Sequence, residues 1–205
     1  MIVISSWGCD DVFKSLFSSV HRGVPPDLNP NDTILLEGGA DIATSIYKER
    51  PNKFTGGFNK PRDLFEVRLT ERGIKAGCSF IGICRGAQLL TAMLGGSLIQ
   101  HVTGHSNGEH QMTTADGETM WATSVHHQMM YPFDLPSHDY EILAHSTEPQ
   151  SRCYLREQDL DVIDRLPKDF VEPEVVWFPK IRGLAIQGHP EYVKPVKLPP
   201  SGWEN

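Results

Sequence analysis

The feature that most constrains the fold is residues 82–86, which read Gly-Ile-Cys-Arg-Gly. This stretch follows the apolar run 79–81 and precedes the helix-forming run 87–90. A side chain held at a sharp turn from a strand into a helix adopts strained dihedrals, so small residues are needed two positions on either side. The pattern therefore predicts a nucleophile elbow with Cys84 in place of a serine. The N-terminus of the following helix would favour a thiolate and an oxyanion there.

A second motif lies far downstream, where Gln-Gly-His-Pro-Glu at residues 187–191 places a carboxylate two residues after a histidine. His189 could hold Cys84 as a thiolate and protonate a leaving amine, and Glu191 would accept its Nδ1–H. The alternative is a buried cysteine and an unrelated turn. The order and strand context of both motifs favour a Cys84-His189-Glu191 triad. As the residue after the nucleophile, Arg85 is predicted to supply one backbone N–H to the oxyanion hole.

Strands and helices alternate along the chain, which implies an α/β fold with a doubly wound, largely parallel central sheet flanked by helices. Asp63 and Glu66 have the spacing of a capping box. The middle third is richer in β-like runs and predicts a small additional β region. A loop near the site is expected at 48–62. Strands are predicted at 2–4, 33–36, 80–84, 120–123, 140–143 and 184–186. Helices are predicted at 11–20, from Leu64 to Gly73, and after Cys84 until Gly95-Gly96 stop the helix.

Composition excludes several function classes. A length of 205 residues suits a single domain over 1–205. The net charge of −7 argues against nucleic-acid binding, and no apolar run approaches a membrane span. The chain start is too short an apolar run for a signal peptide, so a cytoplasmic location is expected. The four cysteines lack paired spacing and are expected to be reduced.

His101, His105 and His110 are clustered in the sequence, and clustered histidines are one feature of a metal site. Gly104 and Gly108 interrupt helical spacing there, and no carboxylate-rich shell is evident in the sequence. Neither a metal nor another cofactor is therefore expected.

Taken together, these motifs resemble the class I glutamine amidotransferase superfamily, including its peptidase C26-like members. The likeness is strongest to the branch containing gamma-glutamyl-gamma-aminobutyrate hydrolase, whose elbow reads Gly-Ile-Cys-Arg-Gly-x-Gln. The chain departs from that pattern in a shorter segment before Gly38-Gly39, in Thr44 where a proline is usual, and in a proline-containing tail after Tyr192. Four other blocks also match. They are Gly-Gly-x-Asp-Ile at 38–42 with Tyr47, Arg-Asp-x-x-Glu at 62–66, Leu-Gly-Gly-Ser-Leu-Ile-Gln at 94–100, and Ser-Val-His-His-Gln at 124–128.

The resemblance implies a flavodoxin-like domain with a second oxyanion donor from the Gly38-Gly39 loop. It also implies substrate-binding roles for Gln88, His126, His127 and Gln128. A solvent-facing helix position is the alternative for Gln88, and the Arg85 side chain could form a surface ion pair. In a strand, His126 and Gln128 would share one face, so at most one of the two histidines would point inward with Gln128.

The activity that the resemblance implies is hydrolysis of γ-glutamyl amide bonds through a thioester on Cys84. One candidate substrate is glutamine, with ammonia passed to a synthetase or ligase on another chain. The other is a γ-glutamylated amine such as γ-glutamyl-GABA, hydrolysed without a partner. A non-catalytic binding or regulatory module is a rival of another class, although the intact triad residues argue against it.

The tail is expected to cover the sheet where relatives carry a helix. Either Leu198 or Trp203 would anchor it in extended form, or another subunit, such as a second copy in a homo-oligomer, would cover that surface.

Overall fold

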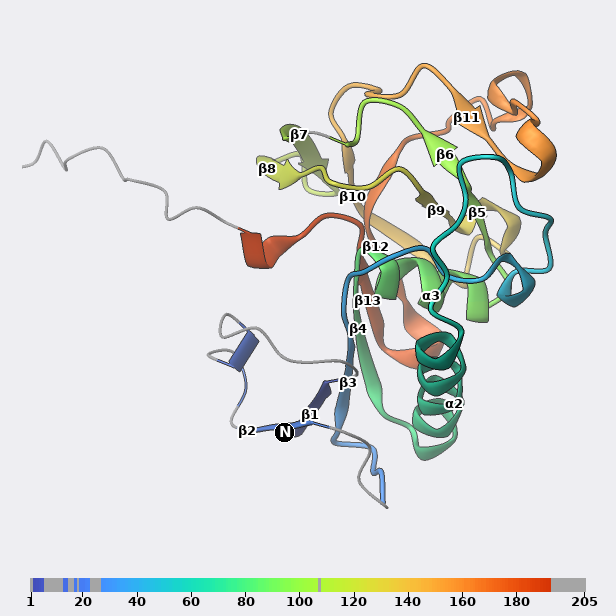
Figure 1. Ribbon diagram of the computed structural model, residues 1–205. Helices are drawn as coiled ribbons and strands as arrows, with labels where there is room; N and C mark the ends of the chain where they lie inside the picture. Colours follow the sequence, from blue (N-terminus) through green and yellow to red (C-terminus); the bar gives the residue numbers. More distant parts are fainter. Residues whose placement is uncertain are drawn as a thin grey trace, which may run out of the picture.

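The computed structural model describes residues 2–5, 13–14, 17, 19–22, 27–106 and 108–192 (Figure 1). Within these ranges the main sheet has nine strands. The first five are parallel to one another and the last four pair in antiparallel fashion. In spatial order they are β2 (Ser19–Arg22), β1 (Ile2–Ser5), β3 (Thr33–Leu36), β4 (Ser79–Ile83), β13 (Gly183–Ile186), β12 (Pro173–Phe178), β10 (Glu141–Ser146), β7 (Glu109–Thr114) and β8 (Thr119–Thr123).

Two small antiparallel sheets lie beside the main one, whereas the runs 120–123 and 140–143, from which the additional β region was predicted, belong to the main sheet as part of β8 and β10. The first pairs β5 (Ser97–Ile99) with β9 (Met129–Tyr131), and the second pairs β6 (His101–Val102) with β11 (Tyr154–Leu155). Short 3₁₀ turns connect these elements. Their bounds are η1 Thr44–Ile46, η2 Pro132–Asp134, η3 Glu157–Asp159, η4 Ile163–Arg165, η5 Pro179–Ile181 and η6 Pro190–Tyr192.

Helix α2 spans Lys60–Ala76 and begins four residues before the predicted start. Its N-cap is Asn59, whose side chain accepts a hydrogen bond from the Arg62 backbone N–H at 3.2 Å. The predicted capping box is wrong, because the Asp63 and Glu66 side chains both bind Arg85 instead. The helix ends at Gly77, which takes the left-handed conformation that ends many helices.

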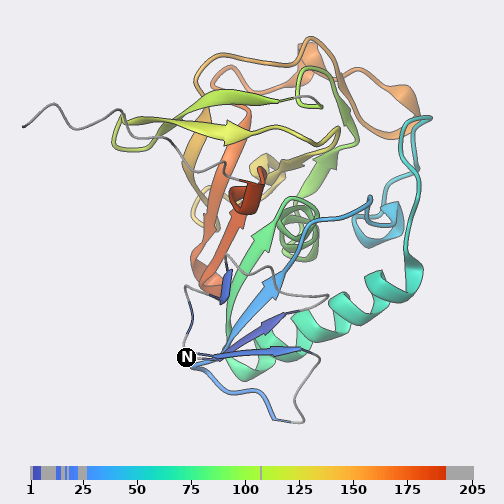
Figure 2. The same cartoon turned by 60° about the vertical axis from the view of Figure 1, so that its left-hand side comes forward.

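Helix α3 spans Arg85–Met93 and follows β4 directly, as the elbow pattern predicts. It ends before Gly95 and Gly96, also as predicted. Figures 1 and 2 show α2 and α3 on the same face of the parallel strands. Buried apolar side chains from both helices, among them Leu69 and Leu89, pack there in one cluster with Phe80 of β4. The α/β fold with a largely parallel core is therefore confirmed.

The opposite face of the parallel strands carries a second apolar cluster, in which Phe13 and Phe17 pack against Leu35 and Ile83. The predicted helix at 11–20 is wrong at its end, because Ser19 and Val20 belong to β2, which pairs with β1. Phe13 and its neighbour are helical, and the rest of that segment lies outside the described residues. The tail from residue 193 also lies outside them. No helix in the described ranges is both long and apolar enough to cross a membrane.

Candidate active site

The elbow places Cys84 between the end of β4 and the start of α3 in a strained conformation, with φ 48° and ψ −105°. The backbone is held on both sides, since the Cys84 N–H donates to the Ile186 carbonyl at 2.7 Å and its carbonyl accepts from the Gln88 N–H at 3.1 Å. Space is tight around it: a Cβ on Gly86 would lie 2.0 Å from the Leu36 carbonyl oxygen. The small residues of the motif are therefore required by close backbone approach.

His189 follows β13 and is held in one orientation by its neighbours. Its Nδ1 lies 2.7 Å from Glu191 Oε1, which leaves Nε2 for a bond to the Cys84 side chain. The His189 backbone N–H donates to the Thr123 hydroxyl at 2.6 Å, and that hydroxyl is 3.0 Å from the His189 carbonyl. A Cβ on Gly38 would lie 2.5 Å from His189 Cε1, so glycine there makes room for the imidazole. The three candidate triad residues are thus brought together.

The charge state of His189 suits a thiolate partner. Burial lowers the pKa of His189, but hydrogen bonds to Cys84 and Glu191 and their negative charges outweigh it and raise the pKa to about 9. An imidazolium beside Cys84 at neutral pH stabilises the thiolate. Burial raises the pKa of the Cys78 and Cys153 thiols, which makes both poor nucleophiles. Cys9 lies outside the described residues.

A pocket of about 280 Å³ opens at Cys84. Gln88 is buried in its wall, and its side-chain amide donates to the Gln128 carbonyl at 3.1 Å, so the solvent-facing alternative for Gln88 is wrong. The lining residues are Gly39, Ala40, Asp41, Phe54, Gly56, Cys84, Gln88, Val125, His126, His127 and Gln128.

The prediction that at most one of His126 and His127 points inward with Gln128 stays a prediction, because the His126 ring stacks on the buried His105 ring, with 4.7 Å between the ring centroids. Both histidines and Gln128 line the pocket, because this segment is irregular and does not alternate faces as a strand would. His127 Nε2 lies 3.0 Å from Asp41 Oδ1. His126 is buried deeper, and burial together with the charges of nearby histidines lowers its pKa to about 3.

The Arg85 side chain forms neither a surface ion pair nor part of the pocket. It is buried and pairs with Asp63 and Glu66 of α2. Arg62 bonds the same Glu66 at 2.8 Å and donates to the Glu37 carbonyl at 2.9 Å. This buried ion network therefore connects the elbow helix to the residue that precedes Gly38, and so positions both candidate oxyanion donors relative to each other.

Sequence reasoning missed the roles of Asp41 and Thr123. Asp41 is in the matched Gly-Gly-x-Asp block, so a signal for it existed, and its Oδ2 accepts from the Gly56 N–H at 3.0 Å. Thr123 gives no such signal, because its contact with His189 spans 66 residues. The predicted loop does lie at the site, where Phe54 lines the pocket.

The pKa of His189 leads to a first expected result, for the variant Glu191→Gln. The amide has no charge and cannot raise the pKa of His189 as the carboxylate does, so the imidazolium is lost at lower pH. We expect kcat/KM for the reaction at Cys84 to fall about 10²-fold and its alkaline limb to move to lower pH. A pH series of initial rates measures both. Glu118→Gln, at an exposed turn, is the matched control, and an unchanged alkaline limb in Glu191→Gln would contradict the assignment.

Comparison with known proteins places this fold and pocket in a family. The peptidase C26 family model matches residues 27–191, and the chain belongs to this family. The described geometry accordingly lies within a class I glutamine amidotransferase-type domain.

The chain is similar to the glutamine amidotransferase-like protein YvdE of Lactococcus lactis, with 36% identity over 101 residues, covering 45% of this chain and 42% of the relative. It is also similar to protein NtpR of Enterococcus hirae, with 42% identity over 72 residues, covering 35% and 30%. The chain thus spans less than half of the length of both relatives.

Among solved structures, a glutamine amidotransferase from Thermotoga maritima superposes with a TM-score of 0.58 at 15% identity, covering 92% of this chain and 75% of that one. This likeness shows the fold.

Proposed function

We propose that this chain hydrolyses γ-glutamyl amide bonds with Cys84 as the nucleophile. The observation that carries the proposal is the position of His189. One ring nitrogen of His189 bonds the Cys84 side chain, and the other lies 2.7 Å from Glu191 Oε1. This arrangement supplies a nucleophile, a general acid and base, and a group that orients the imidazole. Cys84 also lines a pocket large enough for an amino-acid substrate.

In the proposed reaction, Cys84 Sγ attacks the amide carbonyl carbon, and the backbone N–H groups of Arg85 and of the Gly38-Gly39 loop stabilise the oxyanion. The His189 imidazolium gives its proton to the leaving nitrogen as the C–N bond breaks. Neutral His189 then takes a proton from water, whose oxygen attacks the thioester carbon. The S–C bond breaks, glutamate leaves, and the thiolate and imidazolium are restored.

The pocket wall supports an α-amino acid as the bound part of the substrate. Asp41 offers a carboxylate for an ammonium group, and Gln128 Oε1 is buried with no partner among the described residues. A buried acceptor without a donor costs about 1–3 kcal/mol, which a substrate ammonium would recover. Gln88 and His127 supply polar groups that suit the α-carboxylate.

The test is glutamate release from the purified chain, with glutamine and γ-glutamyl-GABA compared at equal concentration. Asparagine, one methylene shorter, is the matched control and should not be hydrolysed. Faster release from γ-glutamyl-GABA supports hydrolysis without a partner. Release from glutamine only once a synthetase or ligase chain is added supports the glutaminase alternative.

A non-catalytic binding module is the remaining alternative. It predicts no glutamate release from either substrate and no covalent labelling of Cys84 by a γ-glutamyl electrophile, as read by mass spectrometry of the intact chain. That pair of results would overturn the proposal.

A further inference from the structure

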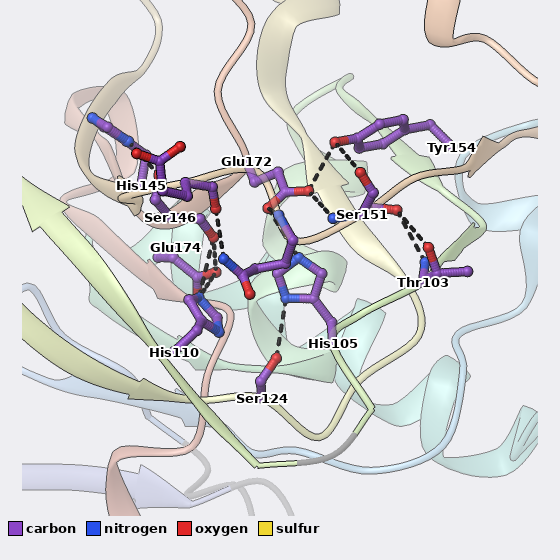
Figure 3. Close-up of polar contacts among 12 residues, drawn as sticks. Thr103, His105, His110, Ser124, His145, Ser146, Ser151, Tyr154, Glu172 and Glu174 are labelled. Carbon is purple, nitrogen blue, oxygen red and sulfur yellow. Dashed lines mark hydrogen bonds and ion pairs between the residues drawn. The ribbon is translucent and has the colours of Figure 1, made fainter.

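A second group of ionisable side chains is buried beside the pocket, between β7, β10 and the start of β12 (Figure 3). Glu172 and Glu174 are 2% and 1% exposed. Their hydrogen-bond partners are imidazoles: His105 Nε2 lies 3.2 Å from Glu172, and His110 Nε2 lies 2.8 Å from Glu174. Figure 3 shows these side chains directed toward one another from separate segments of the chain. Burying carboxylates in this way is costly unless each finds a charged or hydrogen-bonding partner.

The hydrogen bonds determine which nitrogen of His105 keeps a lone pair. Glu172 accepts from the backbone N–H groups of Gln150 and Ser151, both at 2.8 Å, and from the Tyr154 hydroxyl at 2.8 Å. With these donors already on it, Glu172 acts as a carboxylate and accepts the Nε2–H of His105. His105 Nδ1 therefore keeps a lone pair, 3.1 Å from the rotatable Ser124 hydroxyl.

Besides His110 Nδ1, two further lone pairs in this group have no partner among the described residues. His126 Nδ1 donates to the Gln128 carbonyl at 2.9 Å, which leaves Nε2 as an acceptor. Glu174 Oε1 accepts from His110 and from the Ser146 hydroxyl, at 2.8 and 3.0 Å. His126 Nε2 and Glu174 Oε2 are buried and make no hydrogen bond to any described residue. Both atoms are acceptors, so neither can satisfy the other, and each costs about 1–3 kcal/mol as it stands.

We propose that His105, His126 and Glu174 form a buried binding site for a divalent cation of the Zn²⁺ type. One ligand atom from each side chain lies within 4.8 Å of the other two, and all three residues are buried. Two imidazoles and a carboxylate are a donor set that binds Zn²⁺, with a fourth position left for water. The outer contacts also fit, because a metal-binding histidine commonly donates its other N–H to a carboxylate or a backbone carbonyl. Here Glu172 serves His105 and the Gln128 carbonyl serves His126.

Binding needs only small movements. Bonds from Zn²⁺ to nitrogen and oxygen are about 2.0–2.2 Å long, so a cation would draw the three ligand atoms together, and the Ser124 hydroxyl would rotate away from His105. The rival occupant is a buried water that donates to the two unpaired acceptors. A bound water and a bound cation can be told apart by experiment. Binding of the cation requires the negative charge of Glu174, and a bound Co²⁺ ion gives visible absorption bands, which water does not.

The experiment titrates Co²⁺, a spectroscopic substitute for Zn²⁺, into tag-free, chelator-treated protein. Cys84→Ser is used as the background, because the Cys84 thiolate could itself bind the metal. We expect the visible d–d bands of a four-coordinate Co²⁺ ion, their loss on adding one equivalent of Zn²⁺, and a Zn²⁺-dependent rise in the thermal midpoint. Glu174→Gln in this background should weaken binding by at least about 100-fold and remove the thermal shift.

His138→Gln is the matched control, because His138 has an 82% exposed side chain distant in sequence from the site residues, and it should bind Co²⁺ as the background does. His126→Gln is a second site variant. It replaces Glu174→Gln in the comparison if near-UV circular dichroism shows that Glu174→Gln is not folded. The absence of d–d bands in the background protein, or equal bands in the background and the site variants, would overturn the proposal.

Discussion

Cys84→Ala is expected to reduce glutamate release by at least about 10³-fold, since removal of a nucleophile disables the whole group of residues that acts with it. The fold should be retained, because Cys84 stands at a strained turn with φ 48° and alanine keeps the same backbone there. Initial rates of glutamate release measure the loss, and urea unfolding measures the stability.

Cys153→Ala is the matched control for this result. Cys153 is a free thiol outside the pocket lining, and its raised pKa makes it a poor nucleophile. It should keep wild-type activity. If Cys153→Ala removed the activity and Cys84→Ala did not, the elbow would not be the catalytic centre.

Gly86→Ala is expected to lower the free energy of unfolding by about 3 kcal/mol or more. The added Cβ would lie 2.0 Å from the Leu36 carbonyl oxygen, which is backbone of β3 in the middle of the sheet and has no room to move. Since α3 would have to shift away from β3, the elbow should also lose its geometry. Urea unfolding of the purified variant measures the change. Poor recovery of folded protein would also support the prediction, because it would indicate a still larger loss of stability.

Gly56→Ala provides the stability control. A Cβ at Gly56 meets nothing within 4 Å, so its effect on the free energy of unfolding should be within about 0.5 kcal/mol. Equal losses from Gly56→Ala and Gly86→Ala would show that close packing of α3 on β3 is not the reason for the elbow glycine.

The sequence alone determined the features that depend on neighbours along the chain. The elbow, the strand that precedes it, and the helix that ends before Gly95 could be read from residues 79–96, because turn strain and helix termination are local effects. The α/β class followed from the alternation of apolar strands and helices. The pairing of His189 with Glu191 was readable as well, because only one residue separates them.

Only the tertiary structure decided how distant charges pair. Local spacing assigned Asp63 and Glu66 to a capping box, but burial of Arg85 against α2 drew both carboxylates away, since an unpaired buried guanidinium costs more than a cap contributes. The tertiary structure likewise decided that Glu174 and His126, which are 48 residues apart in the sequence, lie close together. Side-chain contacts across such separations depend on strand order and register, which residue patterns within one segment do not encode.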